Sequence, residues 1–388
     1  MVKLFISTGE VSGDLQGALL VSALRRQAEK RGVELEILAL GGDRMAAAGA
    51  TLVGNTLAIG AIGIFEALPY VLPTLQVQGR AKNYLKQNPP DAVVMVDYLS
   101  PNLSIGKFTR KHLPEVPTVY YIAPQEWVWA VGNANTLGVV NLSDRILAVF
   151  PQEATHYQKW GGNVTHVGHP LIDQMAQFPS REQARKALGI APDELAIALL
   201  PASRRQELTY LLPVIAEAAQ RLQAQVPQAR FWIPVSQEGF RPKLESAVQQ
   251  YGLRAAVVEH PSQTVIAAAD LAITKSGTVN LEIALMNVPQ VVLYRVNPLT
   301  AWVARKLLNF KIPFMSPPNL VLMEGIVPEL LQELATPDAI VQEALPLLAG
   351  ARRQKMLADY ERVRQAMGEP GVCDRTANII LDMALAKL

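Results

Sequence analysis

The heptapeptide Ser276–Glu282 (Ser-Gly-Thr-Val-Asn-Leu-Glu) carries residue types well suited to binding an anionic ligand. The preceding run, Asp270–Thr274, has the length and apolar character of a short buried strand, and Ile283–Met286 continues the apolar pattern at helical length. A strand, a tight turn and a helix in this order place free backbone N–H groups and the positive end of a helix dipole at one point. Phosphate groups bind well at such points, so we predict a phosphate site at the Ser-Gly-Thr turn.

This turn consists of Ser276, Gly277 and Thr278, and Glu282 lies four residues beyond Thr278, on the same side of the predicted helix. A carboxylate beside a phosphate site accepts hydrogen bonds from sugar hydroxyls. The combination favours a nucleoside diphosphate whose ribose is held by Glu282. The alternative is helix capping, but a capping box needs Glu or Gln three residues after the capping Ser or Thr, and apolar residues stand at both such positions.

Asp97 ends the run Asp91–Asp97, which is apolar between its two aspartates, so the Asp97 carboxylate is expected to emerge at the end of a strand. A carboxylate in that position can act as the general base on a sugar hydroxyl. The alternative is that Asp97 caps the next helix or turn.

Arg204 follows Ser203 in a second turn between an apolar run and a helical segment. A guanidinium matches a diphosphate both in charge and in its paired donors. The alternative is a surface arginine paired with Glu207.

Gly9–Asp14 (Gly-Glu-Val-Ser-Gly-Asp) forms a third glycine-bearing loop before a helix, although it lacks the dinucleotide-binding spacing. Glu10 and Asp14 would oppose a bare phosphate, so Ser12 and the backbone amides would have to bind an anionic group. Asp14 could equally cap a helix.

His169, between Gly168 and Pro170, is a candidate to reach a ligand, with a structural hinge as its alternative. The histidines show no metal-ligand spacing, and no nucleophile motif is present. We therefore expect no metal, no cofactor and no covalent intermediate.

Strands that alternate with helices position these residues. Near-continuous apolar runs separated by helical segments are typical of a parallel sheet covered on both faces. The runs are Leu4–Ser7, Leu35–Leu40, Asp91–Asp97, Val116–Ile122 and Asp144–Phe150, then Leu195–Leu200, Arg230–Val235, Ala255–Glu259, Leu271–Thr274 and Gln290–Tyr294. The predicted class is α/β, with two Rossmann-like doubly wound domains facing each other across a cleft.

The predicted domains are residues 1–172, residues 173–345 and a helical end, residues 346–388, whose last helix is a candidate to pack back on the first domain. A chain of 388 residues suits two domains of ordinary size.

The formal charge of +2 argues against a nucleic-acid partner. The single cysteine, Cys373, allows no intrachain disulfide and fits a reducing compartment. The N-terminal apolar run is too short for a signal-peptide core.

Two segments are candidates for contact with lipid, although neither makes a convincing span. Ala58–Leu75 is apolar but carries Glu66, two prolines and two glycines. The predicted helix Leu299–Lys311 has an apolar stripe that includes Trp302 and Lys306, which suits a headgroup region as well as an ordinary packed face.

With these motifs together, the sequence resembles lipid-A-disaccharide synthases, inverting glycosyltransferases of the two-domain GT-B fold. The resemblance covers nearly the whole chain. Its motifs are Gly9–Asp14, Pro90–Asp97, Tyr121–Pro124 with Trp127 and Trp129, Val167–Leu171, Leu199–Arg204, Ser276–Thr278 with Glu282, and Pro318–Leu320.

The resemblance implies transfer of 2,3-diacylglucosamine from its UDP donor to 2,3-diacylglucosamine 1-phosphate, giving the β-1,6-linked disaccharide 1-phosphate and UDP. Asp97 matches the carboxylate proposed as base. Ser203, Arg204, Ser276, Gly277, Thr278, Glu282 and Asn319 match the UDP side, and Glu10, Ser12 and His169 are acceptor-side candidates. The expected location is the cytoplasm, where the protein would bind peripherally to the cytoplasmic face of the inner membrane. Acyl-chain length and oligomeric state are not encoded in these motifs.

Four positions depart from the family pattern: Ser100, Ala130, Ala202 and Glu324, the last within Met323–Gly325. The loss of cations at two of them bears on recognition of the acceptor phosphate more than on the donor. Two other function classes stay open: another GT-B enzyme, with a different lipid acceptor or acting as a UDP-sugar epimerase, and a non-catalytic nucleotide-sugar-binding protein. Retention of Asp97 disfavours the second, because binding alone needs no base.

Overall fold

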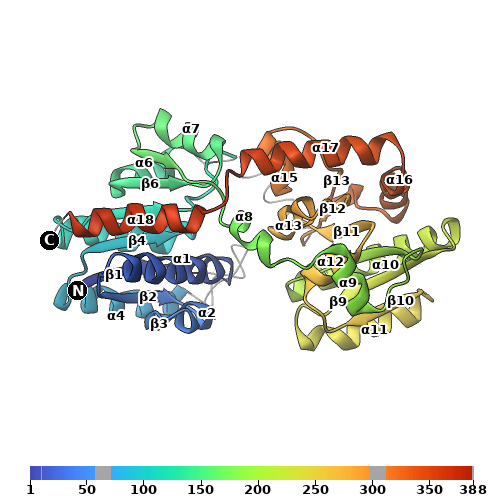
Figure 1. Cartoon of the computed structure of the whole chain (residues 1–388), viewed down its shortest axis with the longest axis horizontal. Helices are drawn as coiled ribbons and strands as arrows, with labels where there is room; N and C mark the ends of the chain where they lie inside the picture. The colour runs from blue at the N-terminus through green and yellow to red at the C-terminus, as the bar shows by residue number, and fades with distance from the viewer. Residues whose placement is uncertain (10, 57–70, 129, 131, 298–311, 387–388) are drawn as a thin grey trace. The chain divides into compact units, whose positions relative to one another are not determined.

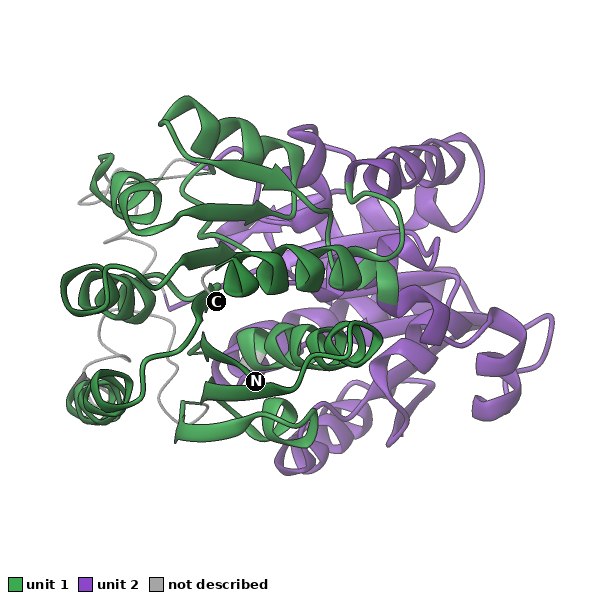
Figure 2. Cartoon of the chain, turned by 60° about the vertical axis from the view of Figure 1, so that its left-hand side comes forward, with its two compact units in different colours: residues 1–173, 367–388 green, residues 174–366 purple. Residues whose placement is uncertain are grey.

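The computed structural model describes residues 1–9, 11–56, 71–128, 130, 132–297 and 312–386. Glu10, Trp129, most of the Ala58–Leu75 segment and the predicted helix Leu299–Lys311 therefore lie outside the described residues. The chain forms two compact units, coloured separately in Figure 2. Unit 1 comprises Met1–Asp173 and Met367–Leu388, and unit 2 comprises Gln174–Ala366.

Unit 1 is built on a seven-stranded, wholly parallel sheet with the strand order β3-β2-β1-β4-β5-β6-β7 (Figure 1). Its strands are β1 (Val2–Ser7), β2 (Leu35–Gly41), β3 (Thr51–Asn55), β4 (Ala92–Val96), β5 (Thr118–Tyr121), β6 (Arg145–Ala148) and β7 (Val164–His166). Its helices are α1 (Val11–Lys30), α2 (Asp43–Ala47), α4 (Val71–Gln87), α5 (Leu99–His112), α6 (Ala134–Leu142), α7 (Pro151–Lys159), α8 (Leu171–Gln174, at the junction) and α18 (Val372–Leu385).

The C-terminal helix α18 packs along α1, as Figure 1 shows. Arg26 of α1 pairs with Asp374 of α18 at 2.8 Å, and Arg31, directly after α1, pairs with Asp382 of α18 at 2.6 Å. The start of α18 is fixed by Asp173, whose carboxylate accepts hydrogen bonds from three successive backbone amides at 371–373. The last helix thus belongs to unit 1, whereas residues 346–366, which the prediction grouped with it, belong to unit 2.

Unit 2 contains a six-stranded parallel sheet with the order β10-β9-β8-β11-β12-β13. Its strands are β8 (Leu195–Leu200), β9 (Ala229–Pro234), β10 (Ala255–Val258), β11 (Leu271–Lys275), β12 (Gln290–Tyr294) and β13 (Glu329–Leu331). Its helices are α9 (Arg181–Leu188), α10 (Arg205–Gln225), α11 (Arg241–Gln250), α12 (Ser262–Ala268), α13 (Val279–Leu285), α15 (Pro317–Leu322), α16 (Pro337–Leu348) and α17 (Ala351–Ala366), with short 3₁₀ turns at η3 (Met175–Gln177), η4 (Glu238–Phe240) and η5 (Gln332–Leu334).

The predicted class, two α/β domains with doubly wound parallel sheets, is confirmed. The apolar runs named from the sequence form the central strands and the edge strand β10, and many of their side chains lie in the buried core of each unit. The edge strands β3, β7 and β13 were not predicted. Among the described residues, no helix combines the length and the apolar character needed to cross a bilayer.

Candidate active site

Each sheet has one place where the strand order reverses direction, and most of the candidate residues follow the strands next to it. In unit 1 it falls between β1 and β4, and in unit 2 between β8 and β11. At such a switch point the loops after the two neighbouring strands diverge, which leaves room for a ligand at the carboxyl ends of the strands. Gly9–Asp14 follows β1 and Asp97 follows β4. Ser203 follows β8, and Ser276 follows β11.

Asp97 has a left-handed backbone, with φ of +54°, and Tyr98 follows it at +26°. Non-glycine residues rarely adopt such angles unless neighbouring groups hold them. Here the carbonyl oxygen of Asp97 accepts hydrogen bonds from Asn102 Nδ2 at 3.1 Å and from the Tyr120 hydroxyl at 2.8 Å. Because α5 begins without a side-chain cap, Asp97 does not cap that helix.

The Asp97 carboxylate is half-buried and receives a hydrogen bond of 3.3 Å from Ser12 Oγ. Burial raises the pKa of Asp97, while the Tyr98 amide and Ser12 act in the opposite direction. A raised pKa makes an ionised carboxylate a better proton acceptor near neutral pH. The structure thus brings together two of the residues predicted for this site, Ser12 and Asp97.

Asp14 proves to be structural. It is fully buried, and its carboxylate accepts hydrogen bonds from the amides of Gly42, Arg44 and Met45, which fixes the start of α2. The capping alternative given for Asp14 is therefore correct, although the helix concerned is α2 and not α1.

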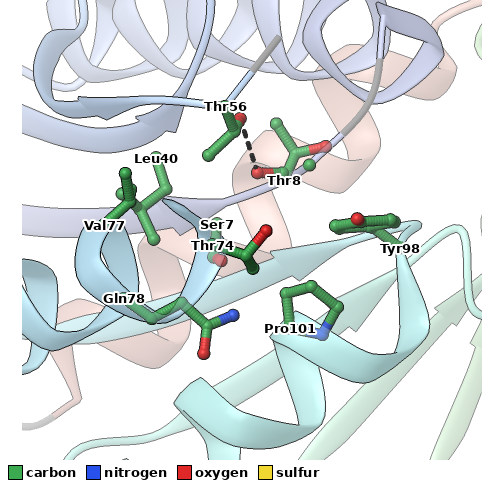
Figure 3. Close-up of a pocket in the computed structure, with 10 residues that line it drawn as sticks. Ser7, Thr8, Leu40, Thr56, Thr74, Val77, Gln78, Tyr98 and Pro101 are labelled. Atoms are coloured by element: carbon green, nitrogen blue, oxygen red, sulfur yellow. Dashed lines mark hydrogen bonds between the residues drawn. The ribbon is translucent and has the colours of Figure 1, made fainter. Parts of the chain in front are cut away.

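Beside this site, the described residues line a narrow pocket that is partly open to solvent (Figure 3). It lies at the carboxyl end of β1, between α4 and α5, and Thr56 Oγ1 donates to the Thr8 carbonyl at its wall. The Thr8 hydroxyl is buried and has no hydrogen-bond partner among the described residues. The Tyr98 ring also lines the pocket and packs against Gly9, where a Cβ atom would lie 1.7 Å from the ring.

Glu153, which sequence reasoning missed, ties together the ends of β5 and β6. Its carboxylate accepts hydrogen bonds from the amides of Ala123 and Val149, both at 2.9 Å. Glu153 is fully buried, and burial raises its pKa to about 8. The available signal was a glutamate at the third position of a helix that begins with Pro151, directly after an apolar strand.

We expect Glu153 to make folding stability depend on pH. The unfolded carboxyl ionises near 4.5, whereas the folded one keeps its proton until about 8, so the free energy of unfolding falls as the pH rises between these values. Between pH 5 and pH 8, wild type should lose on the order of 3 kcal/mol more than Glu153→Gln, at about 1.4 kcal/mol per pH unit. Urea denaturation of both proteins at the two pH values measures this difference, and identical pH dependence would contradict the assignment.

His169 is buried within unit 1. Its Nδ1 accepts a hydrogen bond from the Leu171 amide at 3.2 Å, its ring stacks on Phe150 at 5.1 Å, and its own amide donates to the Met367 carbonyl. Burial lowers the pKa of His169 to about 4, so the ring is neutral at pH 7. These contacts fit the hinge alternative better than a role toward a ligand.

In unit 2, Glu207 shapes the turn that carries Ser203 and Arg204. Its Oε2 accepts hydrogen bonds from the Ser203 amide at 2.7 Å, the Ser203 hydroxyl at 3.1 Å and the Arg204 amide at 3.1 Å. The Arg204 guanidinium is 51% exposed and lies 3.9 Å from Glu207, so the predicted alternative pairing exists but is loose. Arg204 therefore keeps donors available for an anion.

The turn after β11 is closed by Asn280. Its Oδ1 accepts from the Gly277 amide at 2.8 Å, and its Nδ2 donates to the Lys275 carbonyl at 3.1 Å. The Ser276 hydroxyl donates to the Met315 carbonyl, whereas Thr278 is exposed. The turn is thus rigid, and Thr278 is its accessible hydroxyl.

Glu282 does not cap α13, in agreement with the register argument from the sequence. Its Oε2 instead accepts a hydrogen bond of 2.8 Å from Gln263 Nε2 of α12, and burial raises the pKa of Glu282. No described residue donates a hydrogen bond to the other carboxylate oxygen, which can therefore accept one from a ligand hydroxyl.

Asn319 has no hydrogen-bonding capacity left for a nucleotide in this structure. Its Nδ2 donates to the Val327 carbonyl and to Glu329, while its Oδ1 accepts from the amides of Ile326 and Val327. Both amide hydrogens and both lone pairs are therefore used within unit 2. The side chain positions the segment before β13. It therefore does not make the direct contact with UDP that the family resemblance implies for Asn319.

The departures from the family motifs fit the fold locally. Ala202 is not among the residues with positive φ, so the turn does not require a glycine there. Glu324 pairs with Arg362 of α17 at 2.6 Å, and Ser100 lies exposed on α5.

Within the part of the chain that the structure describes, no cluster of His, Cys, Asp and Glu could hold a metal ion.

A family model described as lipid-A-disaccharide synthetase matches residues 4–383. The chain belongs to this family. The synthase of Gloeothece citriformis is 55% identical over 98% of this chain and 100% of its own length. The synthase of Geobacter sulfurreducens is 35% identical, with 98% and 97% covered. The chain is thus an enzyme, a glycosyltransferase of lipid A biosynthesis.

Solved structures share the fold at low sequence identity. A Staphylococcus aureus MnaA–UDP co-structure matches with a TM-score of 0.67 and 15% identity, covering 100% of this chain and 98% of that one. MurG of Acinetobacter baumannii matches with 0.58 and 16%, covering 98% and 100%. These matches confirm the GT-B fold of the synthase family member and carry no information on its substrate.

Proposed function

We propose that the chain transfers 2,3-diacylglucosamine from UDP to 2,3-diacylglucosamine 1-phosphate, forming the β-1,6-linked disaccharide 1-phosphate and UDP. The observation that carries the proposal is Asp97, whose carboxylate is held at the switch point of unit 1 by a constrained backbone. A binding protein would gain nothing from that constraint, whereas a base must be oriented toward the proton that it accepts.

In the proposed step, the 6-hydroxyl oxygen of the acceptor attacks C1 of the donor sugar. The hydroxyl proton passes to the Asp97 carboxylate, and Ser12 orients that carboxylate through its hydrogen bond. The bond from C1 to the β-phosphate oxygen breaks, and its electron pair leaves with UDP. Attack opposite to the leaving group inverts the configuration at C1, consistent with a β-linked product.

The donor is assigned to the switch point of unit 2. Arg204 offers an exposed guanidinium to the diphosphate, the Ser276–Thr278 turn offers backbone and hydroxyl groups, and Glu282 offers a carboxylate oxygen to the ribose. Support comes from membership of the lipid-A-disaccharide synthase family.

The decisive experiment is incubation of the purified protein with the UDP-diacylglucosamine and the monosaccharide phosphate, followed by mass measurement of the products. We expect one new disaccharide phosphate and an equal amount of UDP. UDP release only with a different lipid acceptor would show that the proposed acceptor is wrong. Absence of UDP release with any acceptor would overturn the transferase assignment.

We also propose that the chain contacts the cytoplasmic face of the inner membrane, because both substrates carry acyl chains. Leu72 and Leu75 of α4 are 70% and 59% exposed. The neighbouring helices α4 and α5 contain no Asp or Glu but six Lys and Arg residues. Exposed leucines on a helix that carries only basic charges favour an anionic bilayer surface. The predicted helix Leu299–Lys311 lies outside the described residues and stays a second candidate.

The double variant Leu72→Ser, Leu75→Ser should bind anionic vesicles at least about tenfold more weakly than wild type, because each leucine contributes about 1.5 kcal/mol or more when buried. Co-sedimentation measures the binding, which should also weaken as salt is raised. Leu334→Ser is the matched control, since Leu334 is 64% exposed but lies in unit 2. Equal sedimentation of wild type and the double variant would exclude α4 and leave Leu299–Lys311 as the candidate.

A further inference from the structure

Lys275, the last residue of β11, places its ammonium group against the turn assigned to the donor. Its side chain is only 15% exposed. A Cβ atom added at Gly277 would lie 2.9 Å from Lys275 Nζ, so the glycine leaves the space that the ammonium occupies. Burial lowers the pKa of Lys275, because water solvates its charge incompletely.

Lys275 and Arg204 share a single carboxylate. Lys275 Nζ lies 3.7 Å from Glu207 Oε1, and the Arg204 guanidinium lies 3.9 Å from the same oxygen. The other oxygen of Glu207 already accepts three hydrogen bonds from Ser203 and the Arg204 amide. Two cations facing one carboxylate leave a local charge of +1, at the point where the ends of β8 and β11 adjoin.

The separation from Glu207 leaves the ammonium available to a ligand. A charge-assisted hydrogen bond from nitrogen to a carboxylate oxygen spans about 2.7–2.9 Å, which is shorter than the contact seen here. An ammonium group has three hydrogen-bond donors. A half-buried ammonium gains more free energy from contact with an anionic oxygen than a solvated ammonium does.

We propose that Lys275 is a donor-binding residue that contacts the β-phosphate of UDP, beside Arg204. This inference rests on the proposed function, which places the nucleotide at these two turns. When the bond from C1 to the β-phosphate oxygen breaks, the phosphate takes the electron pair and gains negative charge. A cation fixed in advance at that oxygen stabilises the leaving group without reorganisation.

The test compares UDP with UMP, which lacks the β-phosphate, by calorimetry on wild type and Lys275→Met. We expect the dissociation constant for UDP to rise about 10- to 100-fold, the range for a hydrogen bond to a charged group. The constant for UMP should stay within about threefold. Lys355→Met is the control: it also removes one positive charge from unit 2, on α17, and should change neither constant.

An unchanged UDP affinity in Lys275→Met would overturn the inference, and so would an equal loss for UDP and UMP. Failure of wild type to bind UDP would instead contradict the proposed donor, so the two failures are distinguishable. Lys275→Gln is measured in parallel, and the variant that keeps the wild-type circular dichroism spectrum decides the outcome. If neither variant folds, Lys275 is a structural residue paired with Glu207, and the inference is wrong.

Discussion

Replacement of Asp97 by Asn should lower turnover by about 10²–10⁴-fold, the usual range for loss of a general base. The amide keeps the size of the side chain and can still accept the hydrogen bond from Ser12. The left-handed backbone is held through the carbonyl group of residue 97, which the substitution leaves in place. The folded structure should therefore survive, and only the proton acceptor is lost.

The pH dependence of kcat/KM provides a second readout for the same assignment. Burial raises the pKa of Asp97 above the usual aspartate value of 3.8, so wild-type activity should be lost as the pH falls through a value higher than 3.8. The residual activity of Asp97→Asn should lack this acid limb. Affinity for UDP should hardly change, because the donor residues are assigned to unit 2.

Asp382→Asn is a matched control for Asp97→Asn, because it makes the same substitution in unit 1, on α18, at a surface ion pair. It should retain wild-type turnover and the wild-type acid limb. Near-normal turnover of Asp97→Asn would show that Asp97 is not the general base. His169 would then be the next group to test, although its burial and its contact with the Leu171 amide tie it to the fold.

The central strands could be predicted because their apolar runs are buried on both faces of a parallel sheet. The runs at Leu195–Leu200 and Gln290–Tyr294 coincide with β8 and β12. The edge strands β7 and β13 are only three residues long and half-exposed, so they carry neither the length nor the continuous apolar pattern of a buried strand. Pairing with a neighbouring strand, which a single segment does not reveal, creates them.

The candidate site could be predicted where a polar residue directly follows an apolar strand, as Asp97 and Ser203 do. The site could not be predicted where side chains form hydrogen bonds with the backbone of another segment. Asn319 is saturated by groups seven to ten residues away, and Glu153 bonds to the end of a strand 30 residues earlier. Glu207 was considered only as a partner for Arg204, because its bonds to the turn depend on how the helix begins.

Replacement of Glu282 by Gln should weaken UDP binding by about 1.5–3 kcal/mol, the loss expected when a charged acceptor is removed from shielded ribose hydroxyls. A glutamine can still accept the hydrogen bond from Gln263, and no side chain caps α13, so the melting temperature should change little. Burial raises the pKa of Glu282 above 4.5. Wild-type affinity should therefore decline as the pH falls through that raised value, and the variant should not show this decline.

Calorimetry with UDP at neutral and acidic pH measures both the loss and its pH dependence. Glu343→Gln on α16 is the control, because it removes one carboxylate from unit 2 at an ion pair with Arg352 and should leave UDP affinity unchanged. Equal UDP affinity in Glu282→Gln and wild type would show that the carboxylate serves only its contact with Gln263. A fall in melting temperature without a loss of affinity would lead to the same conclusion, because the hydrogen bond between α12 and α13 would then account for the glutamate.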